Sequence, residues 1–242
     1  MTSRARLIVA AGAPAPRRGV RRVAPALDPG ARRGLLAHHL PPAPRRRLLP
    51  RRPAADVGCG LRGARAVVRA AAATPLRAGA PSVAAARLRV GAGSALIYAP
   101  GALIPHAGAR HLAALDARVE PGGCLAVVQA WAPGRTAHER GRFHHLRSRV
   151  RLAVGARLLL HEDVTVRAPD WPAGDPVAVT ICAIGDWAPA CPDWWKPALE
   201  PLPYAAANPL RGGAIVRALF PALGAAAAFV EGVLRLCANP ST

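Results

Sequence analysis

The chain has 242 residues, enough for one domain of ordinary size or two small ones. Its formal net charge is +20, and arginine supplies all but one of the basic residues. Hydrophobic residues make up 52% of the chain, which excludes disorder throughout, and no uncharged apolar run reaches the roughly 18 residues needed to span a bilayer. Arginine in place of lysine is typical of translation from GC-rich DNA, so the charge alone indicates little about function.

The N-terminal segment, residues 1–52, is rich in arginine and proline. It contains thirteen arginines and a single acidic residue, Asp28, and no sustained apolar period of either kind. Such stretches do not build a packed core, so we expect 1–52 to be mostly irregular and 53–242 to form a single domain. The segment also lacks the hydrophobic region of a secretory signal, which predicts a cytoplasmic protein.

From about residue 61 the sequence consists of short apolar runs separated by glycine turns. Turn-like units surround Gly63, Gly93, Gly123 and Gly155, at intervals of 30, 30 and 32 residues. Strand-like alternation precedes the last three turns, and an apolar run follows each. This pattern predicts β-hairpins stacked in a solenoid-like or ladder-like sheet body, a mainly β fold. Chance matches in a chain rich in glycine and alanine are the alternative.

The C-terminal third predicts three further elements. Residues 176–184 read as a buried strand, and residues 186–203, with three tryptophans among prolines, read as an ordered loop. From about residue 210 the spacing of the apolar residues predicts a helical tail, which Pro221 and Gly224 divide into two short helices.

Motifs that would carry catalysis are missing from the sequence. No phosphate-binding loop, zinc-protease helix or serine nucleophile elbow is present. The adjacent His144 and His145 are expected to point to opposite faces of a strand and therefore not to share a metal ion. The cysteines are odd in number and far apart, which fits neither a disulfide framework nor a paired zinc motif and favours buried free thiols; they are Cys59, Cys124, Cys182, Cys191 and Cys237.

The high charge raises binding of nucleic acids as an alternative function. A chain of charge +20 would bind phosphates non-specifically at low salt. However, residues 1–52 contain no Phe, Tyr or Trp on which bases could stack, and no nucleic-acid-binding motif appears. We therefore expect no specific nucleic-acid partner.

The central segment, Ser94 to Val166, resembles the UreD (UreH) family of urease accessory proteins. The matching motifs follow one another in the family's order: they are Leu96–Pro100, Ile104–Ala109, Gly122–Leu125, Gly134–Ala137, Glu139–Arg140, Leu146–Arg149 and Leu159–Glu162. Upstream, Ala64–Gly79 is similar to another strand of the family. The family's acidic Gly-Asp segment is missing, and only Asp56 stands where its acid would be.

The resemblance implies a sheet-rich scaffold without enzymatic activity or a tightly bound cofactor. It implies binding to apo-urease and to UreF-like and UreG-like partners, with nickel passing in transit to the urease active site. Weak, exchangeable ligands suit a metal ion in transit; the candidates are Glu139, Glu162, His106 and His161. A structural arginine partner is the alternative for each glutamate.

Candidate partner contacts are Arg135 and the apolar residues Leu219, Leu223 and Phe229 of the predicted helical tail. This tail could dock a UreF-like protein or serve as a lid on the sheet. The functional alternatives to the scaffold are a basic nucleic-acid-associated protein and a degenerate, inactive relative of UreD.

Overall fold

The computed structural model describes most of the chain beyond residue 54. The residues described are 6–9, 55–59, 63–70, 72–134, 142–174, 176–185 and 204–238, with the backbone alone for 6–9, 55–59 and 236–238. Within residues 1–52, only the short strand β1 (Arg6–Val9) is described. The predicted tryptophan loop at 186–203 lies outside the described residues.

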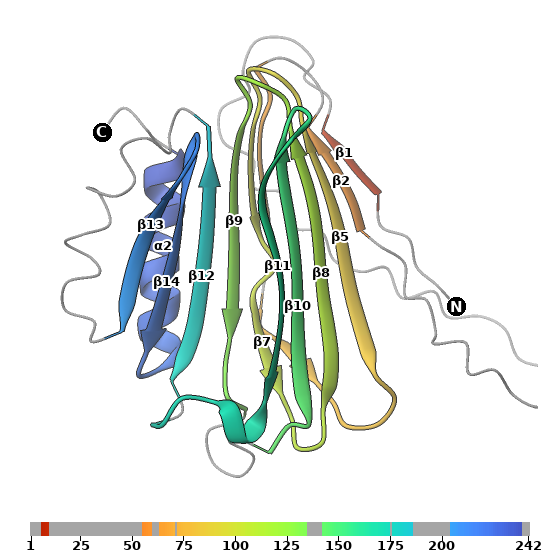
Figure 1. Cartoon of the computed structure of the whole chain (residues 1–242), viewed down its shortest axis with the longest axis vertical. Coiled ribbons are helices and arrows are strands. Elements are labelled where there is room, and N and C mark those ends of the chain that lie inside the picture. The colour runs from red at the N-terminus through yellow and green to blue at the C-terminus, as the bar shows by residue number, and fades with distance from the viewer. Residues whose placement is uncertain are drawn as a thin grey trace, which may run out of the picture.

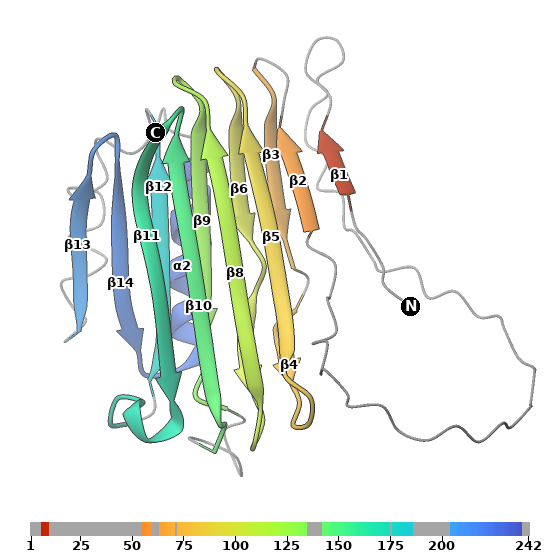
Figure 2. The ribbon, with the colours of Figure 1, turned by 45° about the vertical axis from the view of Figure 1, so that its right-hand side comes forward.

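The described chain is mostly β-structure and forms two sheets that face each other (Figures 1 and 2). The six-stranded sheet has the order β1, β2 (Ala55–Cys59), β5 (Ser82–Val90), β8 (Arg110–Val119), β10 (His145–Val154) and β11 (Arg157–Arg167). The main path of the eight-stranded sheet is β13 (Ala205–Leu210), β14 (Gly213–Phe220), β12 (Val177–Ile184), β9 (Cys124–Trp131), β6 (Ala95–Ala99) and β3 (Arg65–Arg69). The short strands β4 (Thr74–Leu76) and β7 (Ala102–Pro105) complete it. The mainly β fold is confirmed.

The glycine repeat is real, but most of its units are not hairpins. The turns at Gly93 and Gly123 connect strands of different sheets, β5 to β6 and β8 to β9. Successive units then pair in parallel, β5 with β8 and β6 with β9. The body is therefore a ladder of stacked arches, and the hairpin prediction is wrong for these two units. It is correct at Gly155, where β10 and β11 pair antiparallel.

Hydrogen bonds between the turns explain the 30-residue period. The amide of Gly63 donates a hydrogen bond of 3.0 Å to the carbonyl of Gly93, and the amide of Gly93 donates one of 2.9 Å to the carbonyl of Gly122. Gly93 has a φ of +68°, a conformation that side-chain-bearing residues rarely adopt. Each of these turns therefore lies on the next one, and hydrogen bonds along the stack add to the bonds within a turn, such as that from the amide of Ser94 to the carbonyl of Gly91.

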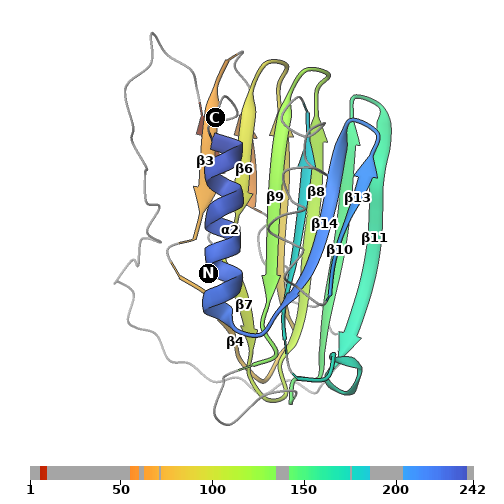
Figure 3. The same ribbon diagram turned by 90° about the vertical axis from the view of Figure 1, so that its left-hand side faces the viewer.

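The core has two layers. Between the sheets lie the inward side chains of both, including Leu88, Leu96, Leu125 and Leu152. The outer face of the eight-stranded sheet is also apolar, and the helix α2 (Leu223–Ala238) covers part of it (Figure 3). Strand β12 lies between β9 and β14, which confirms the buried strand predicted at 176–184.

The helical tail is shorter than predicted. Residues 205–220 form the antiparallel pair β13 and β14, and α2 begins only at Leu223 and runs through Gly224 without a break. Residues 214, 216, 218 and 220 are buried on one face of β14, a period of two that competes with the helical spacing of the same apolar residues. Among the described helices, none is long and apolar enough to cross a membrane.

The two cysteines whose side chains are described carry free thiols, Cys182 buried and Cys124 partly buried. The side chains of the other three lie outside the described residues.

Candidate functional site

The three candidate metal-path residues that the structure describes, His106, His161 and Glu162, are not gathered in one place. His161 and Glu162 are neighbours on β11 and point to opposite faces: His161 lies opposite Arg151 on the exposed face, and Glu162 lies opposite Val150. His106 lies in the turn after β7, where its amide donates to the carbonyl of Leu76 over 2.8 Å. Within the described ranges, no group of three or more His, Cys, Asp or Glu could hold a metal ion. Glu139 and Arg135 lie outside these ranges.

Glu162 has an arginine partner on the opposite sheet. Arg217 on β14 donates a hydrogen bond to its carboxylate, and the pair links β11 to β14. Both side chains are partly exposed, at 28% for Glu162 and 44% for Arg217. The structural interpretation of Glu162, as an arginine partner, therefore has direct geometric support.

Polar side chains continue from this ion pair into the space between the sheets. Arg217, Thr180 and Gln129 occupy one row across β14, β12 and β9. Opposite this row, Ser148 on β10 donates a long hydrogen bond of 3.5 Å to Oε1 of Gln129.

The pKa of the Cys182 thiol is raised to about 12, mainly by burial and further by the charge of Glu162, while Arg217 opposes the shift. Cys182 is therefore a neutral thiol at neutral pH.

His144 and His145 contact each other, contrary to the prediction that their side chains diverge. Their Nδ1 atoms lie 3.0 Å apart, because His144 lies in the bend before β10 and only His145 has strand geometry. The pKa of His145 is lowered, first by burial and then by the charges of His144, Arg110, Arg167 and Arg147. This positive environment disfavours a cation at the histidine pair.

The apolar partner-contact candidates separate into two groups. Phe229 packs on Phe220 of β14 with ring centroids 5.1 Å apart, so the helix acts as a lid on the sheet at this point. Leu219 is half-buried on β14 and is not helical. Leu223, in the first turn of α2, is 37% exposed and lines a groove between the helix and the sheet.

An ion pair that no sequence pattern predicts lies beside this groove. Arg69 on β3 and Glu231 on α2 form it, with Nη2 and Oε1 2.6 Å apart, although they are 162 positions apart in the chain. The walls of the groove are mainly alanine and aliphatic side chains, including Ala99, Val128 and Val230.

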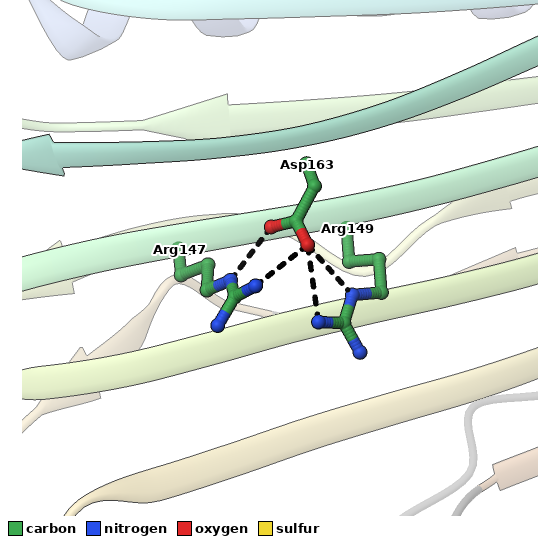
Figure 4. A network of polar contacts seen from close by, with 3 residues as sticks. All are labelled: Arg147, Arg149 and Asp163. Carbon is green, nitrogen blue, oxygen red and sulfur yellow. Dashed lines mark hydrogen bonds and ion pairs between the residues drawn. The ribbon is translucent and has the colours of Figure 1, made fainter.

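A second feature that sequence reasoning missed is an arginine–aspartate network on the outer face of the six-stranded sheet. Arg147 binds both oxygens of Asp163 at 2.6 Å, and Arg149 binds Oδ2 at 3.0 Å (Figure 4). The hydrogen bond from Arg147 is the main cause that holds the pKa of Asp163 well below its usual range. The signal for this face is the alternation of arginine at positions 147, 149 and 151, which puts all three on one side of a strand.

Comparison with known proteins identifies the family. The family model for UreD urease accessory protein matches residues 60–241, which includes both sheets from β3 onward and the helix. The urease accessory protein UreD of Sorangium cellulosum (strain So ce56) is 30% identical over 195 residues, covering 74% of this chain and 61% of the relative. The chain thus spans less than two thirds of the length of that relative. It belongs to the UreD family of urease accessory proteins, which are not enzymes.

Proposed function

We propose that the protein is a scaffold for urease maturation. In this role it binds apo-urease together with UreF-like and UreG-like partners in the cytoplasm and assists delivery of nickel to the urease active site. The observation that carries the proposal is the family match, which extends over the stacked arches and the C-terminal helix. Nickel is cargo in this proposal and not a resident cofactor.

Nickel transit remains a proposal for individual residues. Glu139, Glu162, His106 and His161 are the ligand types that would bind the ion weakly enough to release it. Because Glu162 is paired with Arg217, its carboxylate becomes a nickel ligand only if that ion pair opens. Thr180 and Gln129, which share a row with Arg217 across β12 and β9, supply further neutral oxygen atoms between the sheets.

The UreF-like partner is proposed to contact the C-terminal part of the chain. Leu223 is exposed beside the apolar groove, whereas Phe229 is engaged with the sheet. We therefore place the contact at the first turn of α2, and keep Arg135 as a second candidate.

The test is complementation in a strain that carries urease and its accessory genes but lacks the gene for this chain. Urease activity and the nickel content of purified urease are measured with the chain restored, with an empty vector, and with the chain truncated to residues 53–242. Restored nickel loading supports the scaffold, and survival of that effect after truncation separates it from an N-terminal nucleic-acid role. Full nickel loading in the strain with the empty vector would contradict the proposal, and a chain that never restores loading would be a degenerate relative.

A further inference from the structure

The outer face of the six-stranded sheet is strongly basic. Alternate residues of β5, β8, β10 and β11 point away from the core, and arginine occupies many of these positions. The set, here called the arginine face, consists of Arg87, Arg89, Arg110, Arg118, Arg147, Arg149, Arg151 and Arg167. Acidic residues at outward positions of these four strands are only Asp116 and Asp163. In the views of Figures 1 and 2, no described helix or strand lies over this face, whereas α2 packs on the other sheet.

The two aspartates form ion pairs with only three of the eight arginines of the face. Asp163 binds Arg147 and Arg149, and Asp116 binds Arg151 at 3.3 Å. Within the described residues, the other five arginines of the face form no ion pair. Among the described side chains, the face therefore carries an excess of positive charge over its two aspartates.

Strand register brings the unpaired arginines together. Arg89 lies directly beside Arg118 on neighbouring parallel strands. At the other end of the face, Arg110, His145 and Arg167 form one row across β8, β10 and β11. Like charges directly opposite each other destabilise a sheet. A bound anionic surface would remove this repulsion at both ends of the face.

The chemistry of the face favours a carboxylate-rich protein over a nucleic acid. Between the arginines lies a half-buried apolar strip formed by Val83, Ala85, Leu112 and Ala114, and arginine around an apolar centre is typical of protein interfaces. The four strands contain no Phe, Tyr or Trp on which a base could stack. Arg147 donates two hydrogen bonds to the carboxylate of Asp163, which is the geometry in which a guanidinium on this surface would bind a carboxylate of a partner (Figure 4).

We propose that the arginine face is the docking surface for an acidic protein partner. Carboxylates of the partner would meet Arg89 and Arg118 at one end and Arg110 and Arg167 at the other, with the apolar strip between them. The proposal rests on the proposed function in one respect: the partner is taken to be the urease apoprotein, so the inference adds which face binds it and by what chemistry.

The experiment compares two variants of the full chain with the same change in charge. In the face variant, Arg89, Arg110, Arg118 and Arg167 are each replaced by glutamate. In the control variant, glutamate replaces the exposed arginines Arg65, Arg77, Arg211 and Arg235, which lie on other surfaces. Binding of purified urease apoprotein is measured at low and high salt, with a short DNA duplex as a second probe, and circular dichroism verifies that both variants fold. A milder variant with glutamine at the four face positions replaces the glutamate variant if the latter does not fold.

We expect the face variant to bind urease apoprotein at least about tenfold more weakly, the control to remain within about twofold of the original chain, and the difference to shrink at high salt. Equal binding of the two variants, or a loss confined to DNA, would overturn the docking proposal. Different results would contradict the docking surface and the proposed scaffold function. Urease activation with unaltered binding of the face variant contradicts only the docking surface, while face-dependent binding without any urease activation contradicts only the proposed function.

Discussion

Glu162 and Arg217 are 55 positions apart in the sequence and form an ion pair between the two sheets. The pair links β11, an edge strand of the six-stranded sheet, to β14 of the other sheet. Glu162, a nickel-path candidate from the sequence, therefore has a structural partner in the folded protein. Since both side chains are partly exposed, solvent screens the pair and its contribution to stability is small.

The first prediction concerns this pair. Replacing Glu162 or Arg217 by glutamine should lower the free energy of unfolding by about 0.5–1 kcal/mol, and replacing both should cost less than the sum of the single changes. Denaturant unfolding of the four proteins measures the coupling. If E162Q keeps full stability but prevents nickel loading of urease, then Glu162 acts on the ion and the structural role is secondary.

The second prediction uses two glycines in contrasting surroundings. A Cβ added at Gly213 would lie 2.2 Å from the carbonyl oxygen of Ala183 on the neighbouring strand β12. Gly213→Ala should therefore lower the free energy of unfolding by about 2–3 kcal/mol, because the strands must separate to admit the methyl group. Gly232 lies within α2 with nothing within 4 Å of such a Cβ, so Gly232→Ala should raise stability by about 0.5–1 kcal/mol.

Thermal and urea unfolding of the two alanine variants test this contrast. A neutral Gly213→Ala would show that β12 and β14 are not paired as described. A loss of stability in Gly232→Ala would show that the surface of the helix at that position is covered.

The 30-residue period of the body was predictable from sequence, but the pairing of its strands was not. Alternation of apolar residues identifies β5 and β6 as strands and glycine identifies the turn between them, yet the same pattern fits a hairpin and an arch. The difference lies in where the backbone hydrogen bonds go. The bond from Gly93 to Gly122 joins two turns 29 positions apart, and no local sequence signal reports such a contact.

The C-terminal error has a different cause. Residues 215, 219 and 223 fit a helical spacing, but residues 214, 216, 218 and 220 fit a strand equally well. Packing of β14 between β12 and β13 decides between the two patterns, and only the tertiary structure supplies those neighbours. The Glu162–Arg217 pair and the arginine face were unpredictable for the same reason, since both depend on register between strands distant in sequence.

The third prediction separates the two roles considered for the C-terminal helix. Phe229 packs on Phe220, whereas Leu223 is exposed at the start of α2. Phe229→Ala should lower the free energy of unfolding by about 2–3 kcal/mol, somewhat less than for a fully buried phenylalanine. Leu223→Ala should change it by about 0.5 kcal/mol or less and should weaken binding of a UreF-like protein. Urea unfolding and a pull-down with that partner measure the two effects. If both variants bind the UreF-like protein as strongly as the original chain does, α2 is not the contact.

The fourth prediction is a pH dependence that originates at His145. Burial, His144 and the arginines Arg110, Arg167 and Arg147 lower the pKa of His145 in the folded protein. Below the ordinary histidine pKa of about 6.5, the unfolded chain therefore binds more protons at this site than the folded chain does, and stability should fall as the pH decreases. The decrease ends once the pH is below the pKa of His145 in the folded protein, where this histidine is protonated in both states.

His145→Gln should reduce the loss of stability between roughly pH 7.5 and pH 5, as measured by urea unfolding at each pH. Arg110→Gln removes one of the repelling charges, so it should raise the pKa of His145 and reduce the same loss only in part. An unchanged pH dependence in His145→Gln would show that other groups cause it.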